Sequence, residues 1–209
     1  LAIIFISVKQ DHKAICKLMD DAGIAVFGCT TNGEFIDEAT EKGSIAILLL
    51  DINRSYFQIY FEEYPEKNYR EITNRIAQKV KERFSAPAFF IAGSNMETDA
   101  EELLFGFEDV VGKEVNVYGC MAGDDFTFSD QFVFTNEYSS SRGLVCLALD
   151  EEKIMIRGVA TCGWRAVGTL RTVTKSSGNH VYTVDDIPVL DLTTKYGGLE
   201  NVSPDNEGL

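Results

Sequence analysis

Two short stretches rich in glycine and small polar residues contain the side chains best suited to binding a ligand. They cover residues 28–35 and 119–126, and each begins Gly-Cys after an apolar run and ends in a carboxylate followed by Phe. A glycine-rich turn after a buried strand exposes backbone N–H groups that can bind carboxylate or phosphate oxygens. The alternative is that the glycines only satisfy turn geometry.

Acidic groups stand at related positions in the two stretches. Glu34 and Asp124 could hold an ammonium group, or they could cap a following turn. Two similar loops at strand ends can converge on one cleft, so we expect the stretches to form a single site. The candidate ligand-binding residues here are Cys29, Thr30, Thr31, Asn32, Glu34, Met121, Ala122 and Asp124.

A third stretch, residues 158–168, places the single tryptophan, Trp164, beside Arg165. Arginine can bind a carboxylate through two parallel hydrogen bonds, and tryptophan offers a flat apolar wall. The alternative is a core tryptophan beside a surface arginine that pairs with one of the 33 acidic side chains. Together the three stretches suit a small zwitterion, with Arg165 and the N–H groups of a glycine-rich turn for its carboxylate and Glu34 or Asp124 for its ammonium group.

Catalysis by a cysteine is the main chemical alternative. Cys29 and Cys120 follow predicted strands, but no base can be identified for either of them. His12 falls on a predicted helix and His180 at a turn, so a Cys–His pair would depend on the tertiary fold. We therefore expect no enzyme and no catalytic residues, and keep a cysteine-dependent hydrolase or transferase as an alternative.

Neither a metal nor a cofactor is expected. The chain has two histidines and five cysteines without CxxC spacing, which argues against a zinc site. The phosphate-binding P-loop and the dinucleotide fingerprint are both missing. Cysteines of this kind predict a reducing, cytoplasmic location.

The elements that must position these residues repeat along the chain. Residues 1–8 predict a buried strand, Asp11 caps a helix with Ala14, Ile15, Leu18 and Met19 on one face, and Gly23 ends it. Further helices are expected at residues 68–84, from 98 or 99 to 112, and from Pro188 to 196. Further strands are expected at residues 24–29, 44–51, 56–61, 88–92, 115–120, 131–135, 143–149, 153–162, 170–174 and 180–184.

This order predicts an α/β fold with mixed parallel and antiparallel sheets and helices packed outside. Two similar halves, about residues 1–85 and 86–196, suggest an internal duplication within one ligand-sensing domain, residues 1–196. Residues 197–209 are expected to be a linker toward an absent C-terminal portion, so the chain is expected to be one domain of a larger protein.

Composition limits the possible partners. The 209 residues are 45% hydrophobic and carry a net charge of −14, as expected for a globular protein that repels phosphate backbones and anionic lipids. Nucleic-acid and membrane partners are therefore not expected. No apolar run is long enough to span a bilayer.

The same motifs resemble the FIST family, a sensory domain named for F-box and intracellular signal transduction proteins. The resemblance is carried by residues 28–34, 119–125 with 132–134, 158–168 and 178–182, by Asp185 and by residues 188–190. Thr30 and Cys120 depart from the Ser and Gly that are common at those positions. The resemblance implies a cytoplasmic, bacterial-type module that senses small ligands such as amino acids and acts on a C-terminal portion and a signalling output domain.

We therefore expect a non-enzymatic sensor that binds an amino acid or a related small carboxylate near the Gly-Cys stretches. Besides the hydrolase or transferase, a protein-interaction scaffold without a small ligand remains open.

Overall fold

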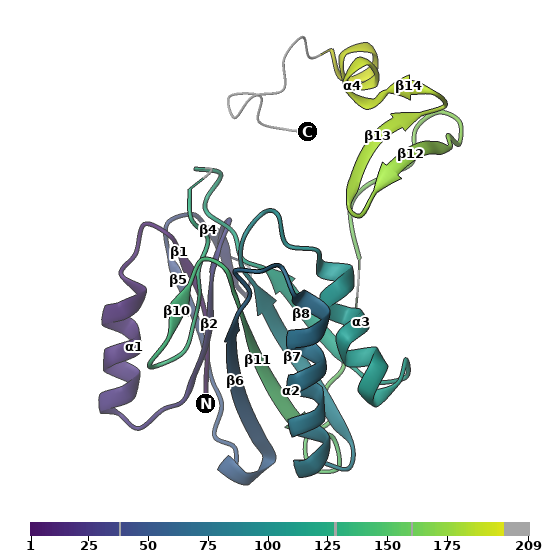
Figure 1. Cartoon of the computed structure of the whole chain (residues 1–209). Helices are drawn as coiled ribbons and strands as arrows, with labels where there is room; N and C mark the ends of the chain where they lie inside the picture. Colours follow the sequence, from purple (N-terminus) through teal and green to yellow (C-terminus); the bar gives the residue numbers. More distant parts are fainter. Residues whose placement is uncertain (38, 128, 160, 199–209) are drawn as a thin grey trace. The chain divides into compact units, whose positions relative to one another are not determined.

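Figure 1 shows a computed structural model of the chain, which describes residues 1–37, 39–127, 129–159 and 161–198. The chain divides into two compact units, Leu1–Gly158 and Val159–Leu209. In the described part of the chain, the first unit contains two large sheets, a two-stranded hairpin and three α-helices, and the second contains a small sheet and one α-helix. Among the described residues, no helix is both long and apolar enough to cross a membrane.

The first sheet has five strands in the order β10-β9-β2-β1-β5. Helix α1 connects β1 to the parallel strand β2, and β5 lies antiparallel on the other side of β1. Asp11 begins α1 by accepting a hydrogen bond from the Ala14 N–H at 3.1 Å, as the sequence predicts. The bounds are β1 Ala2–Ser7, α1 His12–Asp21, β2 Val26–Thr31, β5 Ile45–Leu49, β9 Val133–Phe134 and β10 Ser139–Ser140.

The second sheet has four strands in the order β6-β11-β7-β8. Helix α3 connects β7 to the parallel strand β8, and β11 lies antiparallel between β7 and β6. Helix α2 lies between β6 and β7 in the chain. The bounds are β6 Phe57–Glu63, α2 Tyr69–Arg83, β7 Pro87–Gly93, α3 Ala100–Val111, β8 Val117–Met121 and β11 Gly143–Asp150.

The first unit is built in four layers, with α1 outside the first sheet and α2 and α3 outside the second (Figure 1). Side chains point alternately to the two faces of a sheet, so each sheet contributes to a hydrophobic cluster on either side. On β1, Ile4 and Ile6 pack toward α1, whereas Ile3 and Phe5 pack toward the second sheet. A third cluster, with Phe89 and Phe107, fills the space between the second sheet and its helices.

Two smaller elements complete the first unit. Glu34–Ile36 (β3) and Ala39–Glu41 (β4) form an antiparallel hairpin, and Arg54–Tyr56 (η1) is a single 3-10 turn. The second unit contains β12 (Val173–Ser177), β13 (His180–Val184), β14 (Ile187–Pro188) and α4 (Val189–Gly197), which Gly198 ends with φ of 69°.

The fold class predicted from the sequence is confirmed, because both large sheets mix parallel and antiparallel pairs and helices cover them. The internal duplication and the boundaries near residues 85 and 196 stay predictions. Of the predicted linker, Gly197 and Gly198 belong to the end of α4, and residues 199–209 lie outside the described residues.

Several predicted elements were wrong. The described residues of the expected strand 153–162 are not in a strand. The buried face of α1 holds Cys16 and Met19, whereas Leu18 is 62% exposed. The hairpin of β3 and β4 was not predicted, because each strand has three residues, all exposed except Glu34, and neither has a long apolar run.

Candidate functional site

The two glycine-cysteine stretches lie against each other at the ends of β2 and β8. The Gly123 N–H donates to the Thr30 carbonyl at 2.8 Å, and the Asp125 N–H donates to the Thr31 carbonyl at 3.3 Å. The side chain of Asn32 joins them further, since its Oδ1 accepts from the Asp124 and Asp125 N–H groups at 2.7 and 2.9 Å. The structure thus brings together stretches separated by about 90 residues.

The glycines that open the stretches lie within strands and are required by close packing. A Cβ at Gly28 in β2 would lie 2.0 Å from the Phe134 ring, and one at Gly119 in β8 would lie 2.2 Å from the Ile91 carbonyl oxygen. Gly33, with φ of 128°, is the residue that needs glycine for its backbone conformation. The expectation that these glycines serve turn geometry therefore holds for Gly33 but not for Gly28 or Gly119.

The backbone N–H groups of the second stretch already have partners inside the protein. The Ala122 N–H donates to the Gly93 carbonyl at 2.7 Å, and the next three N–H groups donate to the first stretch. Asn32 Oδ1 occupies the position that a ligand oxygen would take in an anion-binding turn. A ligand carboxylate could bind these N–H groups only by displacing Asn32.

Glu34 is 4% exposed and fastens the hairpin to the beginning of β5. Its carboxylate accepts hydrogen bonds from the Thr31 hydroxyl, the Ser44 N–H at 3.0 Å and the Ser44 hydroxyl at 2.6 Å. Asp124 instead closes a local turn, because its carboxylate accepts from the Ser129 N–H at 2.9 Å. Of the two roles left open by the sequence, Asp124 adopts the turn-capping one.

Asp125 is a residue of the junction that the sequence prediction did not select. Its side chain is 1% exposed, one carboxylate oxygen accepts from the Ser7 hydroxyl, and Lys9 Nζ lies 4.0 Å away. The other oxygen is buried and has no hydrogen-bond partner among the described residues. The sequence did contain a signal, because Asp125 precedes Phe126 as Glu34 precedes Phe35.

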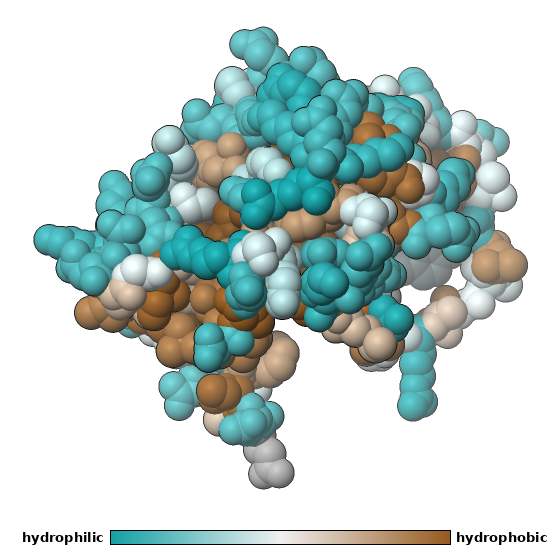
Figure 2. All heavy atoms as spheres, turned by 90° about the horizontal axis from the view of Figure 1, so that it is seen from below, coloured by the Kyte–Doolittle hydropathy of each residue, from teal (hydrophilic) through white to brown (hydrophobic). Residues whose placement is uncertain are grey.

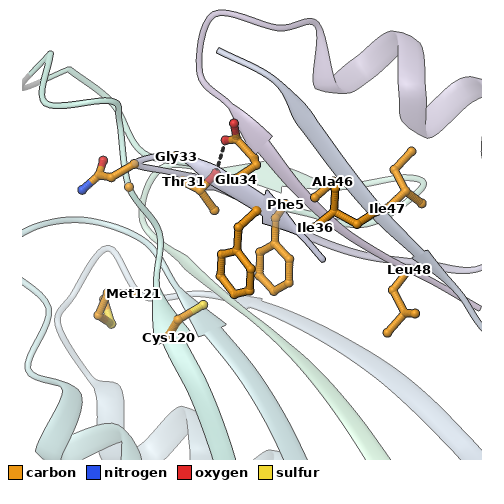
Figure 3. Close-up of a pocket in the computed structure, with 13 residues that line it drawn as sticks. Phe5, Thr31, Gly33, Glu34, Ile36, Ala46, Ile47, Leu48, Cys120 and Met121 are labelled. Carbon is orange, nitrogen blue, oxygen red and sulfur yellow. Dashed lines mark hydrogen bonds between the residues drawn. The ribbon is translucent and has the colours of Figure 1, made fainter. Parts of the chain in front are cut away.

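A cavity of about 580 Å³ opens beside the junction, between β1 and β5 of one sheet and β8 of the other (Figure 3). Most of its wall is apolar, and its polar groups come from the first stretch and the hairpin. Thr31 and Glu34, joined by a hydrogen bond, lie at one end of the wall in Figure 3. The lining residues are Phe5, Thr31, Asn32, Gly33, Glu34, Phe35, Ile36, Ala46, Ile47, Leu48, Cys120, Met121 and Gly123.

Four of the predicted binding residues, Thr31, Asn32, Glu34 and Met121, line this cavity. The other four from the two stretches are buried, and they are Cys29, Thr30, Ala122 and Asp124. Trp164 and Arg165 belong to the second unit, where both are exposed, whereas the cavity is built by the first unit.

The apolar wall was missed by the sequence prediction. It comes from Phe5 of β1, from Ala46–Leu48 of β5 and from the hairpin, where Phe35 is 77% exposed and Ile36 is 62% exposed. Large apolar side chains placed directly after Glu34, outside any predicted buried strand, were the available signal.

The thiols of Cys29 and Cys120 lie 3.9 Å apart, one on each sheet. The hydrogen bond between them and burial both raise the pKa of Cys29. The same hydrogen bond lowers the pKa of Cys120, while burial opposes that shift. Cys120 is therefore the member of the pair that loses its proton first.

Two arrangements that would support catalysis, a histidine paired with Cys29 or Cys120 and a metal site, are not formed by the described residues of the first unit. His12 lies on the α1 side of the first sheet, where it stacks on Phe134 and its Nε2 is 3.0 Å from the Ser139 hydroxyl oxygen. His180 belongs to the second unit. No group of three or more His, Cys, Asp or Glu side chains among the described residues could hold a metal ion.

Hydrophilic side chains cover much of the face shown in Figure 2, as expected for a chain with 33 acidic and 19 basic residues. Hydrophobic residues also reach that surface in patches.

The family model described as the FIST N domain matches residues 1–187. No curated protein and no solved structure shows a significant match to the chain. Because the family match spans most of the sequence, this chain belongs to the FIST N domain family, a family of signal-transduction sensory domains.

Proposed function

We propose that the domain senses a small ligand with an apolar body and a polar head, and that the ligand binds in the cavity beside the junction. The observation that carries this proposal is the cavity itself, which is lined by residues of both glycine-cysteine stretches. Its volume of about 580 Å³ lies within the range typical of small-molecule sites.

The wall of the cavity selects the chemical class of the ligand. Phe5, Ile36 and Leu48 offer apolar surface, which favours an aliphatic or aromatic group. Glu34 supplies the polar end. A carboxylate has about four acceptor sites, and Glu34 uses three of them, two on Oε2 and one on Oε1. One site on Oε1 remains for a ligand ammonium group.

Asn32 can serve the other end of a zwitterion. Its Oδ1 is bound to the second stretch, so its amide NH₂ is the part that can donate to a ligand carboxylate. We therefore propose an amino acid with an apolar side chain, or a related small carboxylate, as the ligand. This proposal uses residues of the first unit only.

A bound ligand changes signalling only if it prefers one conformation of the domain. The hairpin of β3 and β4 forms part of the cavity wall and is held by the buried contacts of Glu34. We propose that ligand binding orders this hairpin and that its position is read by a C-terminal portion and a signalling output domain in the cytoplasm.

A thermal-shift screen of the twenty amino acids and common small carboxylates tests the proposal. A ligand at about 100 times its Kd stabilises the folded state by about 2.7 kcal/mol, which raises Tm by about 5–10 °C in a domain of this size. Leu48→Glu places a charge in the cavity wall and should abolish the shift. Leu18→Glu, at an exposed apolar residue on α1, is the matched control and should keep it.

Either of two results would reject the proposed site. A ligand that stabilises Leu48→Glu as strongly as the unchanged domain binds elsewhere. If the whole panel fails to shift the folded, unchanged domain, the exposed side chains of Phe35 and Ile36 favour the protein-interaction scaffold instead.

A further inference from the structure

The pairing of two thiols from different sheets has no role in the proposed binding of a ligand. Cys29 lies in β2, in the interior of the first sheet, and Cys120 lies in β8, at the edge of the second. We propose that these cysteines are an oxidisable pair, which a peroxide converts to a disulfide that joins the two sheets.

The geometry needs only a small change for a bond to form. The two sulfur atoms are 3.9 Å apart, and a disulfide requires about 2.05 Å. The remaining approach of about 2 Å lies within the reach of side-chain rotation together with a slight shift of an edge strand. Strand β8, which carries Cys120, is such an edge strand, because it pairs with β7 on one side only.

Backbone contacts keep the two thiols facing each other. One residue beyond Cys29, the Thr30 carbonyl accepts from the Gly123 N–H at 2.8 Å. Two residues beyond Cys120, the Ala122 N–H donates to Gly93 at 2.7 Å and anchors the end of β8 to β7. The junction therefore holds the cysteines in register, and oxidation needs no unfolding.

Cys120 is the thiol that an oxidant can reach. It lines the cavity of about 580 Å³ and also a groove of about 310 Å³ between β8 and α3, and it is exposed, whereas Cys29 is 0% exposed. The thiolate is the form that reacts with a peroxide. The hydrogen bond from Cys29 favours that form at Cys120.

The chemistry balances with hydrogen peroxide as the oxidant. The Cys120 thiolate attacks one peroxide oxygen, the O–O bond breaks, and hydroxide leaves and takes up a proton to become water. The Cys29 sulfur then attacks the sulfur of the Cys120 sulfenic acid and the S–O bond breaks. The hydroxyl group leaves and takes up the Cys29 proton to become water. Two thiols are oxidised to one disulfide, and one peroxide is reduced to two waters.

The other three cysteines lie in different surroundings. Burial raises the pKa of Cys16 to about 11 and strongly raises the pKa of Cys146, and these two lie in other core clusters. Cys162 is exposed in the second unit. It is therefore the control, since it is a second exposed thiol outside the pair.

The test is peptide mapping of the unchanged domain. The reduced protein is treated with one to a few equivalents of hydrogen peroxide, alkylated, and digested without reductant. The expected product has lost two hydrogen atoms and yields a cross-linked peptide containing Cys29 and Cys120. Cys120→Ser should abolish that product, and Cys162→Ser should leave it unchanged.

Trapping the intermediate assigns the order of the two steps. In Cys29→Ser the sulfenic acid at Cys120 cannot be resolved, so labelling of Cys120 by dimedone should rise several-fold. The proposal is overturned if Cys120 of the unchanged domain proceeds to sulfinic acid, or if it links to Cys162 or to a second molecule. The mapping uses the unchanged protein, so the test stands even if a variant fails to fold.

Discussion

At the scale of single residues, Asn32 shows how one side chain can take the place of a ligand. The sequence predicted correctly that the two glycine-cysteine stretches would meet, but it suggested free N–H groups as their common feature. In the structure Asn32 satisfies two of those groups itself. Nothing local to Asn32 reveals this, because its partners are more than 90 residues away.

Replacing Asn32 should therefore weaken the junction. Asn32→Leu leaves the Asp124 N–H without an acceptor and removes the shorter of the two hydrogen bonds of the Asp125 N–H, which keeps only the Thr31 carbonyl. The cost is about 1–2 kcal/mol because the site is partly open to water. Asn32→Asp keeps an acceptor oxygen at the same position and should retain more of the stability. Urea unfolding of the three proteins measures the difference. Equal losses in both variants would show that the acceptor is not what matters.

His12 links the stability of the domain to pH. Its ring stacks on Phe132 and Phe134, and burial is the main cause that lowers its pKa. Lys13 lowers it further, and Asp11 partly opposes the shift. Because the folded state disfavours the proton, the unfolded chain binds it first as the pH falls.

The contribution of His12 is therefore complete above the ordinary histidine pKa of about 6.5 and is lost as the pH falls below it. His12→Gln should reduce the drop in the free energy of unfolding between pH 7.5 and pH 5.5, relative to the unchanged domain. An NMR titration of the ring checks the direction independently. A His12 midpoint above about 6.5 would reverse the sign of the prediction.

At the scale of elements, the sequence identified those strands and helices that carry their own pattern. Asp11 and Gly112 mark the beginning of α1 and the end of α3 as predicted, and the apolar run of β1 is buried on both faces. The prediction of a strand at residues 153–162 was wrong, because an alternating apolar pattern forms a strand only where a partner strand is present. On α1, Cys16 is buried and Leu18 is not. Cys16 belongs to the same buried cluster as Phe134, which lies far away in the chain.

Gly106 in α3 shows tertiary packing overriding helix propensity. A Cβ at this position would lie 1.9 Å from Thr73 Oγ1 and 2.3 Å from the Arg70 carbonyl oxygen, both on α2. In an isolated helix Gly106→Ala would gain about 1 kcal/mol. Here the helices must separate, so we expect the domain to lose about 2 kcal/mol.

Gly163→Ala is the control for Gly106→Ala, because no atom lies within 4 Å of a Cβ there. Its free energy of unfolding should stay within about 0.5 kcal/mol of the unchanged value. Urea unfolding of both variants measures the contrast. A stabilised Gly106→Ala would mean that α2 and α3 are not packed this closely.

At the scale of the whole molecule, the sequence predicted the class of fold but not which strands share a sheet. Strand β6 belongs to the first predicted half, yet it pairs with β11 in the second sheet. Conversely, β9 belongs to the second predicted half but pairs with β2 in the first sheet. Hydrophobic periodicity along one strand does not reveal this exchange, because it shows which side chains are buried and not which strand is the partner. The two walls of the candidate site come from different sheets, β1 and β5 from the first and β8 from the second.

The division into two units gives a prediction for the chain as a whole. All three hydrophobic clusters are formed by residues of the first unit, whereas Leu192 is the one buried hydrophobic residue among the described part of the second. A fragment of residues 1–158 should therefore unfold cooperatively in urea, with a midpoint close to that of the 209-residue chain. A fragment of residues 159–209 should give no cooperative transition, because it buries too little apolar surface to offset its chain entropy. Circular dichroism during the titration follows both fragments. If the longer fragment lost several kcal/mol, the four-layered unit would need the second unit for its stability, and the cavity would have to be studied with both units present.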